Sequence, residues 1–233
     1  MKSWKDILKE QRTPLIAASI LFVTGIFVQT LSNAAGVSIN DAADIITATV
    51  TLVGIYIAWS GLNTWKKQVR GTKEFDIAYK LNYSVLRLRE AIKSVRNPAI
   101  WPSENREALK FAQEKYPELS IVEVKKKPNE FIYERRWQEI SKTLAKVEAN
   151  LLAAEVLWGR EIIQLIQPIK RKITDLNIAL SQHFNPDLKT KSYEEIDETI
   201  NADLSEPPKD RFSIELNNAV QKVTDYLKPK IRS

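Results

Sequence analysis

The stretch PLIAASILFVTGIFVQTL, from Pro14 to Leu31, contains no ionisable side chain. As a helix it would be ~27 Å long at ~1.5 Å per residue, close to the hydrocarbon thickness of a bilayer. A second stretch of this kind, IITATVTLVGIYIAWSGL, runs from Ile45 to Leu62. Both are apolar all the way round and not along one stripe, which is unusual for a core helix of a soluble protein. We therefore predict two membrane spans, at about residues 14–31 and 45–62.

A secretion signal is the alternative interpretation of the first stretch, because basic residues precede it. The small-residue segment SNAAG after it, however, leads straight into the second stretch. Removal of the first stretch would leave the second facing the wrong way. The order of the two stretches therefore favours an anchored transmembrane hairpin.

The basic residues beside the two stretches predict their orientation. Four precede the first stretch and four follow the second, whereas the connecting segment SNAAGVSINDAAD has none; the eight are Lys2, Lys5, Lys9, Arg12, Lys66, Lys67, Arg70 and Lys73. By the positive-inside rule both chain ends lie in the cytoplasm. We predict a cytoplasmic segment 1–13, a transmembrane hairpin 14–64 and a cytoplasmic domain 65–233, in the bacterial inner membrane.

The composition argues against a conventional enzyme. The 233 residues include no cysteine and a single histidine, His183, so thiolate catalysis and Cys-ligated zinc are excluded. No phosphate-binding glycine loop or metalloprotease motif occurs. An acidic run, Glu194 to Glu198, lacks the ligand spacing and turn glycine of a calcium loop. We predict no catalytic residue, no metal site and no cofactor.

The net charge of +6 is distributed unevenly. The first 73 residues carry +4 of it, and the remaining residues, with 27 basic and 25 acidic groups, carry only +2. The basic excess therefore flanks the apolar stretches. A nucleic-acid-binding domain would usually have the opposite distribution.

After Trp65 the apolar residues recur at steps of three and four, which predicts amphipathic helices. We expect a first helix that ends at Asn97-Pro98, a connector over 98–129 with one helix at 103–115, and a long helix over 130–167 that Pro168 ends or kinks. The run SIVEV resembles a strand but has no partner strand, so we assign it to the connector. A helix to about His183, a brief helix YEEIDETI and a last helix capped by Ser213 complete the chain. The fold class is all-α: a two-helix transmembrane hairpin followed by a cytosolic helical bundle or bent coiled coil.

Small and hydroxylated residues in the second stretch are candidates for packing inside the membrane. Gly54 and Ala58 form a small-xxx-small pair, and Thr47 and Thr51 add hydroxyl groups. Such residues let helices approach closely and hydrogen-bond to one another. Either the two spans pack on each other, or these faces also join several copies into a homo-oligomer.

Two groups of basic residues are candidate contacts for an anion or a partner. One lies on the first cytosolic helix and the other around the stretch YERRW; they are Arg87, Arg89, Lys93, Arg96, Lys125, Lys126, Lys127, Arg135 and Arg136. They fit solvated faces with salt bridges to nearby glutamates, contact with anionic lipid headgroups, or binding of a nucleotide or nucleic acid. The sequence leaves these three interpretations open and disfavours the last.

The stretch WKKQVRGTKEFDIAYKLNYSVLRLREAIKSVRNP, Trp65 to Pro98, resembles a type of small bacterial membrane protein, and so do the stretches YERRW and AEVLWGREI. Those proteins have two N-terminal spans and a helical cytosolic domain. The plan of the chain is also similar to the two-span membrane effectors of bacterial phage-defence systems, retron-associated ones included. This likeness implies a cytosolic domain that receives a signal and a hairpin that perturbs the membrane.

Three functional hypotheses follow from these patterns. The first is a non-enzymatic, oligomerising membrane protein whose cytosolic domain binds a cytosolic protein and whose hairpin anchors or perturbs the bilayer. The second is a passive scaffold that holds a partner protein at the membrane. The third is a receptor domain for a nucleotide or another phosphate-bearing ligand.

Overall fold

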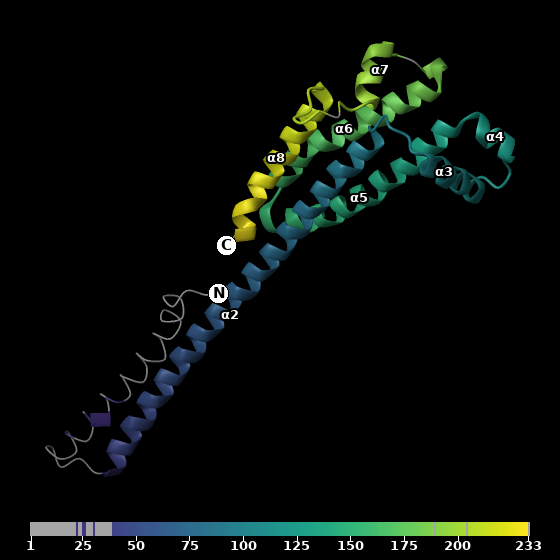
Figure 1. Ribbon diagram of the computed structural model, residues 1–233. Helices are drawn as coiled ribbons and strands as arrows, with labels where there is room; N and C mark the ends of the chain where they lie inside the picture. Colours follow the sequence, from purple (N-terminus) through teal and green to yellow (C-terminus); the bar gives the residue numbers. More distant parts are fainter. Residues whose placement is uncertain are drawn as a thin grey trace. The chain divides into compact units, whose positions relative to one another are not determined.

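The computed structural model describes residues 22, 25, 26, 30, 39–188, 190–203 and 205–232, and the chain divides into two units, 1–71 and 72–233 (Figure 1). All regular structure in the described residues is helical, as the sequence predicts, and no strand occurs among them. The described helices are α2 (Ile39–Val95), α3 (Pro102–Lys115), α4 (Ile121–Lys126), α5 (Pro128–Trp158), α6 (Glu161–Phe184), α7 (Tyr193–Ile200) and α8 (Arg211–Arg232), with a short 3₁₀ turn at Pro186–Leu188.

Helix α2 contains the whole of the predicted second span, 45–62. From Ile46 onward it is long and apolar enough to cross a membrane, by length and composition, and none of its most apolar window is buried among the described residues. It is the one helix of this kind in the described part of the chain. The predicted first span, 14–31, lies outside the described residues except at positions 22, 25, 26 and 30.

In the second unit, α2 from Ala78 onward, α5, α6 and α8 surround one hydrophobic core, which we call the four-helix core (Figure 1). Its fully buried side chains recur at helical spacing on all four helices, among them Leu81, Val85, Leu88 and Ile92 of α2. Burial of one apolar stripe per helix is the main source of stability in such packing. The amphipathic pattern expected after Trp65 therefore predicts this part of the core correctly.

Polar contacts fix how these helices run. Asn150 on α5 donates to the Ser84 hydroxyl of α2 at 3.3 Å, and Arg87 on α2 lies 3.6 Å from the Glu139 carboxylate farther back on α5. The two helices are therefore antiparallel. Thr224 of α8 donates to Asn82 at 3.0 Å, whereas the start of α8 lies at Arg96, so α8 is also antiparallel to α2.

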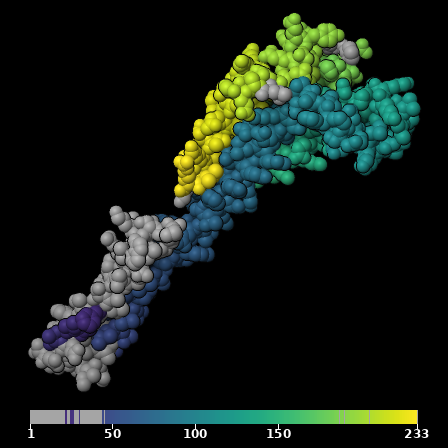
Figure 2. Space-filling model, in the orientation of Figure 1, coloured from purple at the N-terminus to yellow at the C-terminus, as the bar shows by residue number. Residues whose placement is uncertain are grey.

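Helices α3 and α4 pack on the start of α5 around a second, smaller core of Ala108, Ala112, Val124, Phe131 and Ile132. Figure 2 shows this α3–α4 segment, in teal, as a lobe at one edge of the second unit. The lobe is joined to the four-helix core through α5, which contributes side chains to both cores.

The prediction of one long helix over 130–167 is wrong. The helix ends at Trp158, and Gly159, with a φ of 74°, follows it in the left-handed region that favours glycine. The next helix, α6, includes Pro168 without ending there. A glycine turn reverses the chain, so that α5 and α6 both face the same core.

Two further predictions need correction. The run SIVEV is helical, because the Ser120 hydroxyl accepts from the Glu123 N–H at 3.3 Å and the Glu123 carboxylate accepts from the Ser120 N–H at 2.8 Å. Helix α8 begins two residues before Ser213, and its cap is Asp210, whose carboxylate accepts from the Ser213 N–H at 2.8 Å. The short helices expected at 103–115 and at YEEIDETI are confirmed.

The four-helix core predicts a contrast between two isoleucines of α6. Ile166 is fully buried and Ile178 is 41% exposed. We expect Ile166→Ala to lower the free energy of unfolding by about 2–5 kcal/mol, because it leaves a cavity, and Ile178→Ala to change it by less than about 1 kcal/mol. Urea unfolding of the detergent-solubilised chain, followed by tryptophan fluorescence, measures both. Equal losses would contradict the assignment of this core.

Candidate functional site

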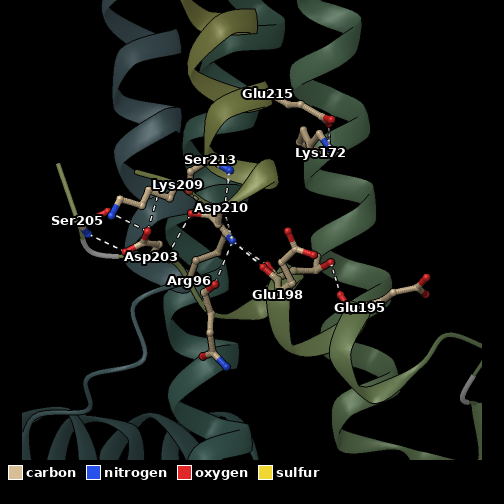
Figure 3. A network of polar contacts seen from close by, with 12 residues as sticks. Arg96, Lys172, Glu195, Glu198, Asp203, Ser205, Lys209, Asp210, Ser213 and Glu215 are labelled. Atoms are coloured by element: carbon tan, nitrogen blue, oxygen red, sulfur yellow. Dashed lines mark hydrogen bonds and ion pairs between the residues drawn. The ribbon is translucent and has the colours of Figure 1, made fainter. Parts of the chain in front are cut away.

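The C-terminal end of α2 is held by a buried arginine, Arg96, which is 1% exposed (Figure 3). Its guanidinium donates to the backbone carbonyls of Glu198, Thr199 and Asn201 at 2.8–3.1 Å. These carbonyls lie at the C-terminal end of α7, where a helix has no backbone donors left for them. The Arg96 side chain therefore caps α7 from a different helix, and its positive charge lies at the negative end of the α7 dipole.

The same guanidinium also binds the start of α8. It donates to the Asp210 carboxylate at 2.9 Å and to the Ser213 hydroxyl at 2.6 Å, and it lies 4.1 Å from the centre of the Phe212 ring. In the backbone, the Ala202 N–H donates to the Arg96 carbonyl at 2.8 Å. The residue that directly follows α2 thus joins the C-terminal end of α7 to the start of α8.

The electrostatics of this contact fit a permanently charged pair. Burial lowers the pKa of Arg96, and the hydrogen bond and charge of Asp210 act in the opposite direction. Burial would raise the pKa of Asp210, but hydrogen bonds from Ser213 and Arg96 outweigh it, so the pKa lies below its ordinary value. Both groups are therefore ionised at neutral pH.

A second buried arginine, Arg136 of α5, holds the segment that follows α2. It binds both oxygens of the Glu104 carboxylate at 2.8 and 2.9 Å, and it donates to the carbonyls of Asn97 and Ala99 at 2.6 and 2.8 Å. The hydrogen bond from Arg136 lowers the pKa of Glu104, and burial acts against it. A two-point contact of this kind fixes orientation as well as charge.

We call Arg96, Arg136 and these partners the α2 clamp. The two arginines were among the residues predicted to contact an anion or a partner, and the structure places both in the interior, with backbone and carboxylate oxygens around them. Both guanidinium groups are therefore occupied by internal partners and do not form part of a surface for an external ligand. The clamp has no reacting group of its own; it fixes the end of α2 to α7, α8 and the α3–α4 lobe.

The other predicted basic contacts lie on the surface. Five of them have carboxylate neighbours. On α2, Arg87 lies 3.6 Å from Glu139, and Arg89 and Lys93 lie 2.8 and 3.8 Å from Glu90. Near YERRW, Lys127 lies 3.3 Å from Glu130, and Arg135 binds Glu107. These exposed pairs fit the interpretation as solvated salt bridges. Lys125 and Lys126 on α4 are exposed and have no ion pair among the described residues.

A polar hollow of about 290 Å³ lies beside the clamp, between α6, α7 and the start of α8. Three cations line it, but so do three carboxylates; the charged residues are Lys172, Asp175, Lys191, Glu195, Glu198 and Arg211. Lys172 and Arg211 also bind Glu215, at 2.5 and 2.7 Å, which lowers the pKa of Glu215 to about 2. The charges of the hollow balance, so it does not favour a phosphate-bearing ligand.

The predicted packing residues of the second span are all on α2. The Thr51 hydroxyl donates to the Thr47 carbonyl at 2.8 Å, so it is satisfied one turn back in its own helix. A Cβ added at Gly54 would meet no atom within 4 Å, and Ala58 is exposed. The described residues therefore leave this face open.

The residues considered for metal chemistry are not brought together. Within the described ranges, no three side chains of the types His, Asp or Glu form a group that could hold a metal ion. The His183 ring lies edge-on against the Phe184 ring at 4.9 Å, on the exposed side of α6.

Comparisons of the chain with protein-family models, with curated proteins and with solved structures each found no match. The proposals below therefore rest on the sequence and the geometry.

The α2 clamp predicts unequal effects for two arginines, one within α2 and one directly after it. Arg96→Met removes the partner of the buried Asp210 and of three helix-end carbonyls, and we expect it to lower the free energy of unfolding by about 3–5 kcal/mol. The control is Arg87→Met, whose side chain is 57% exposed and which should cost less than about 1 kcal/mol. Urea unfolding measures both, and a loss for Arg96→Met no larger than that of the control would contradict the clamp.

Proposed function

We propose that this chain is a non-enzymatic protein of the bacterial inner membrane whose second unit binds a cytosolic protein and whose hairpin anchors that unit and responds to binding. The observation that carries the proposal is α2. It is one uninterrupted helix with an uncharged, unburied stretch over 46–62 and a core-forming stretch over 78–95. Both stretches belong to one helix, so no loop separates the proposed membrane segment from the segment that forms the core.

Three features support the membrane assignment and its orientation. The backbone of a helix is satisfied internally, which the bilayer interior requires. The four basic residues after Leu62 and the four before Pro14 favour a cytoplasmic position for both chain ends by the positive-inside rule. Trp59 and Trp65 are exposed at the point where α2 changes from apolar to charged, which suits the interfacial aromatic belt.

The response to binding is the further step of the proposal. The α2 clamp ties the end of α2 to three other elements of the second unit, so a partner that changes their packing acts on α2 directly. The open face with Gly54 and Ala58 suits contact with the first span or with a second copy. Perturbation of the membrane, the action of the two-span phage-defence effectors that the chain resembles, is the output that we propose.

A passive scaffold is the main alternative. A rigid clamp would serve it equally well, because a scaffold needs only a fixed surface. A nucleotide receptor is less favoured, since Arg96 and Arg136 are occupied by internal partners and the polar hollow is balanced in charge.

If the hairpin anchors the chain, both chain ends lie in the cytoplasm, and two charges placed within a span should disrupt this topology. An epitope inserted after Asn33 should be accessible in spheroplasts, and a C-terminal epitope only after lysis. In Leu52→Arg/Ile55→Arg this pattern should be lost, because each arginine near the centre of a span costs about 2.5–3.5 kcal/mol. The matched control is Leu152→Arg/Val156→Arg, at two exposed apolar residues of α5, and it should keep the pattern. An unchanged pattern in the first variant would show that 45–62 is not a span.

The response distinguishes an effector from a scaffold. We expect overproduction of the natural chain to lower the membrane potential, read with a potential-sensitive dye. Replacement of residues 14–62 by an unrelated two-span hairpin should abolish the effect, because only the original hairpin perturbs the bilayer. A potential that stays unchanged with the natural chain in every condition would reject the effector role and leave the scaffold.

A further inference from the structure

The α3–α4 lobe carries an apolar groove of about 290 Å³, between α3, α4 and the start of α5. Its floor is formed by Ala108, Val124 and Phe131 of the smaller core and by Leu109, which packs against that core. We call it the lobe groove. It lies outside the α2 clamp and outside the apolar stretch of α2.

Two cations line the rim of the lobe groove, Arg106 on α3 and Lys125 on α4. Both are exposed, and neither has an ion pair among the described residues. Lys110 lies one helical turn after Arg106, on the same face of α3. Two nearby cations, by contrast, are paired with carboxylates: Arg135 binds Glu107, and Lys127 binds Glu130. Arg106 and Lys125 therefore leave two unneutralised positive charges on the rim of the groove, whereas Lys126, which also has no ion pair among the described residues, lines a neighbouring hollow.

From this combination we propose that the lobe groove binds an acidic segment of a partner protein and takes one bulky apolar side chain of that segment into its floor. Carboxylates on either side of the apolar side chain would face Arg106 and Lys125. The two cations come from two different helices, α3 and α4, which suits a segment that carries negative charge on both sides of its anchor. This deepens the proposed function, because it names the chemistry of the cytosolic partner.

The size of the groove favours a peptide over a lipid chain. Pockets for whole small molecules usually measure about 300–1,000 Å³, and the lobe groove lies at the lower limit, where one side chain fits. Ile121 lies one turn before Lys125 on the same face of α4 and is exposed, as is Val122. These two residues offer further exposed apolar contacts on α4, one of the helices that line the groove.

The test uses the full chain in a nonionic detergent and a dye-labelled, glutamate-rich peptide with one central phenylalanine. Fluorescence anisotropy reports binding. We expect saturable binding that becomes at least about tenfold weaker in Arg106→Glu/Lys125→Glu. The matched control, Lys142→Glu/Lys146→Glu, makes the same charge change at two exposed lysines of α5 that have no ion pair among the described residues. It should stay within about twofold of the natural chain.

Two further peptides separate the apolar contribution from the charge contribution. A peptide with serine in place of the phenylalanine should bind at least about tenfold more weakly. A peptide with lysines in place of the glutamates should bind Arg106→Glu/Lys125→Glu better than it binds the natural chain. Both results are expected if the groove reads the anchor and its flanking charges together.

Several results would overturn the proposal: no saturable binding, equal weakening by the two double variants, or equal binding of the serine peptide. Displacement of the bound peptide by decanoate, at a decanoate concentration lower than that of the peptide, would identify a fatty-acid site instead. Circular dichroism of each variant confirms that it is folded. Because binding is measured in detergent, its failure leaves the membrane topology untouched, and loss of the topology leaves the binding result untouched.

Discussion

The side chains of α2 suit two different surroundings, and the change from one to the other lies close to Trp65. Over 46–62 the helix is uncharged and apolar on every side, and none of its most apolar window is buried among the described residues. Apolar surface in water costs about 25 cal/mol per Å², so a bare helix of this length needs another medium or another protein around it. After Ala78 only one face is apolar, and that face is buried in the four-helix core. The two stretches of one helix therefore need different surroundings, and the proposed function depends on this constraint.

The far end of α2 meets a different constraint, that of unsatisfied backbone oxygens. The carbonyls at the end of α7 and those after α2 have no helical donors, and buried carbonyls without donors cost free energy. Arg96 and Arg136 supply the donors, each with a carboxylate nearby to balance its charge. A lysine, with one small ammonium group, could not reach so many oxygens in one plane. The clamp therefore explains why two charged side chains lie inside a protein that has few other buried charges among its described residues.

The sequence predicts the helices whose signals are local. Periodic apolar residues predict the core stripe of α2, and the helix expected at 103–115 corresponds to α3. The sequence does not predict the end of α5 at Trp158, because Pro168 is the stronger signal for the end of a helix. Gly159 is nevertheless the residue at which the chain reverses. The capping box at Ser120 and Glu123 is a local signal for α4, and the prediction of an irregular connector at this run does not use it.

The functional surfaces were harder to predict than the helices. In sequence, Arg96 and Arg136 look the same as the exposed arginines around them, since their partners lie up to 117 positions away. Arg106 was not singled out, because it becomes notable only when α4 folds beside α3 and leaves an apolar floor between them. No local pattern contains that information. Lys125, by contrast, lines the lobe groove, and its contact with a partner stays a prediction.

The central claim is that α2 is covered by lipid over 46–62 and by protein over 78–95. The chain has no natural cysteine, so single cysteines placed along α2 in membrane vesicles can be tested one at a time for reaction with a water-soluble maleimide. The account predicts that every position over 46–62 is protected, whatever its face, and that protection over 78–95 recurs with the helical period of about 3.6 residues. A 3.6-residue period that begins at Ile46, or full reactivity there, would mean that protein or water surrounds this stretch, and it would contradict the account.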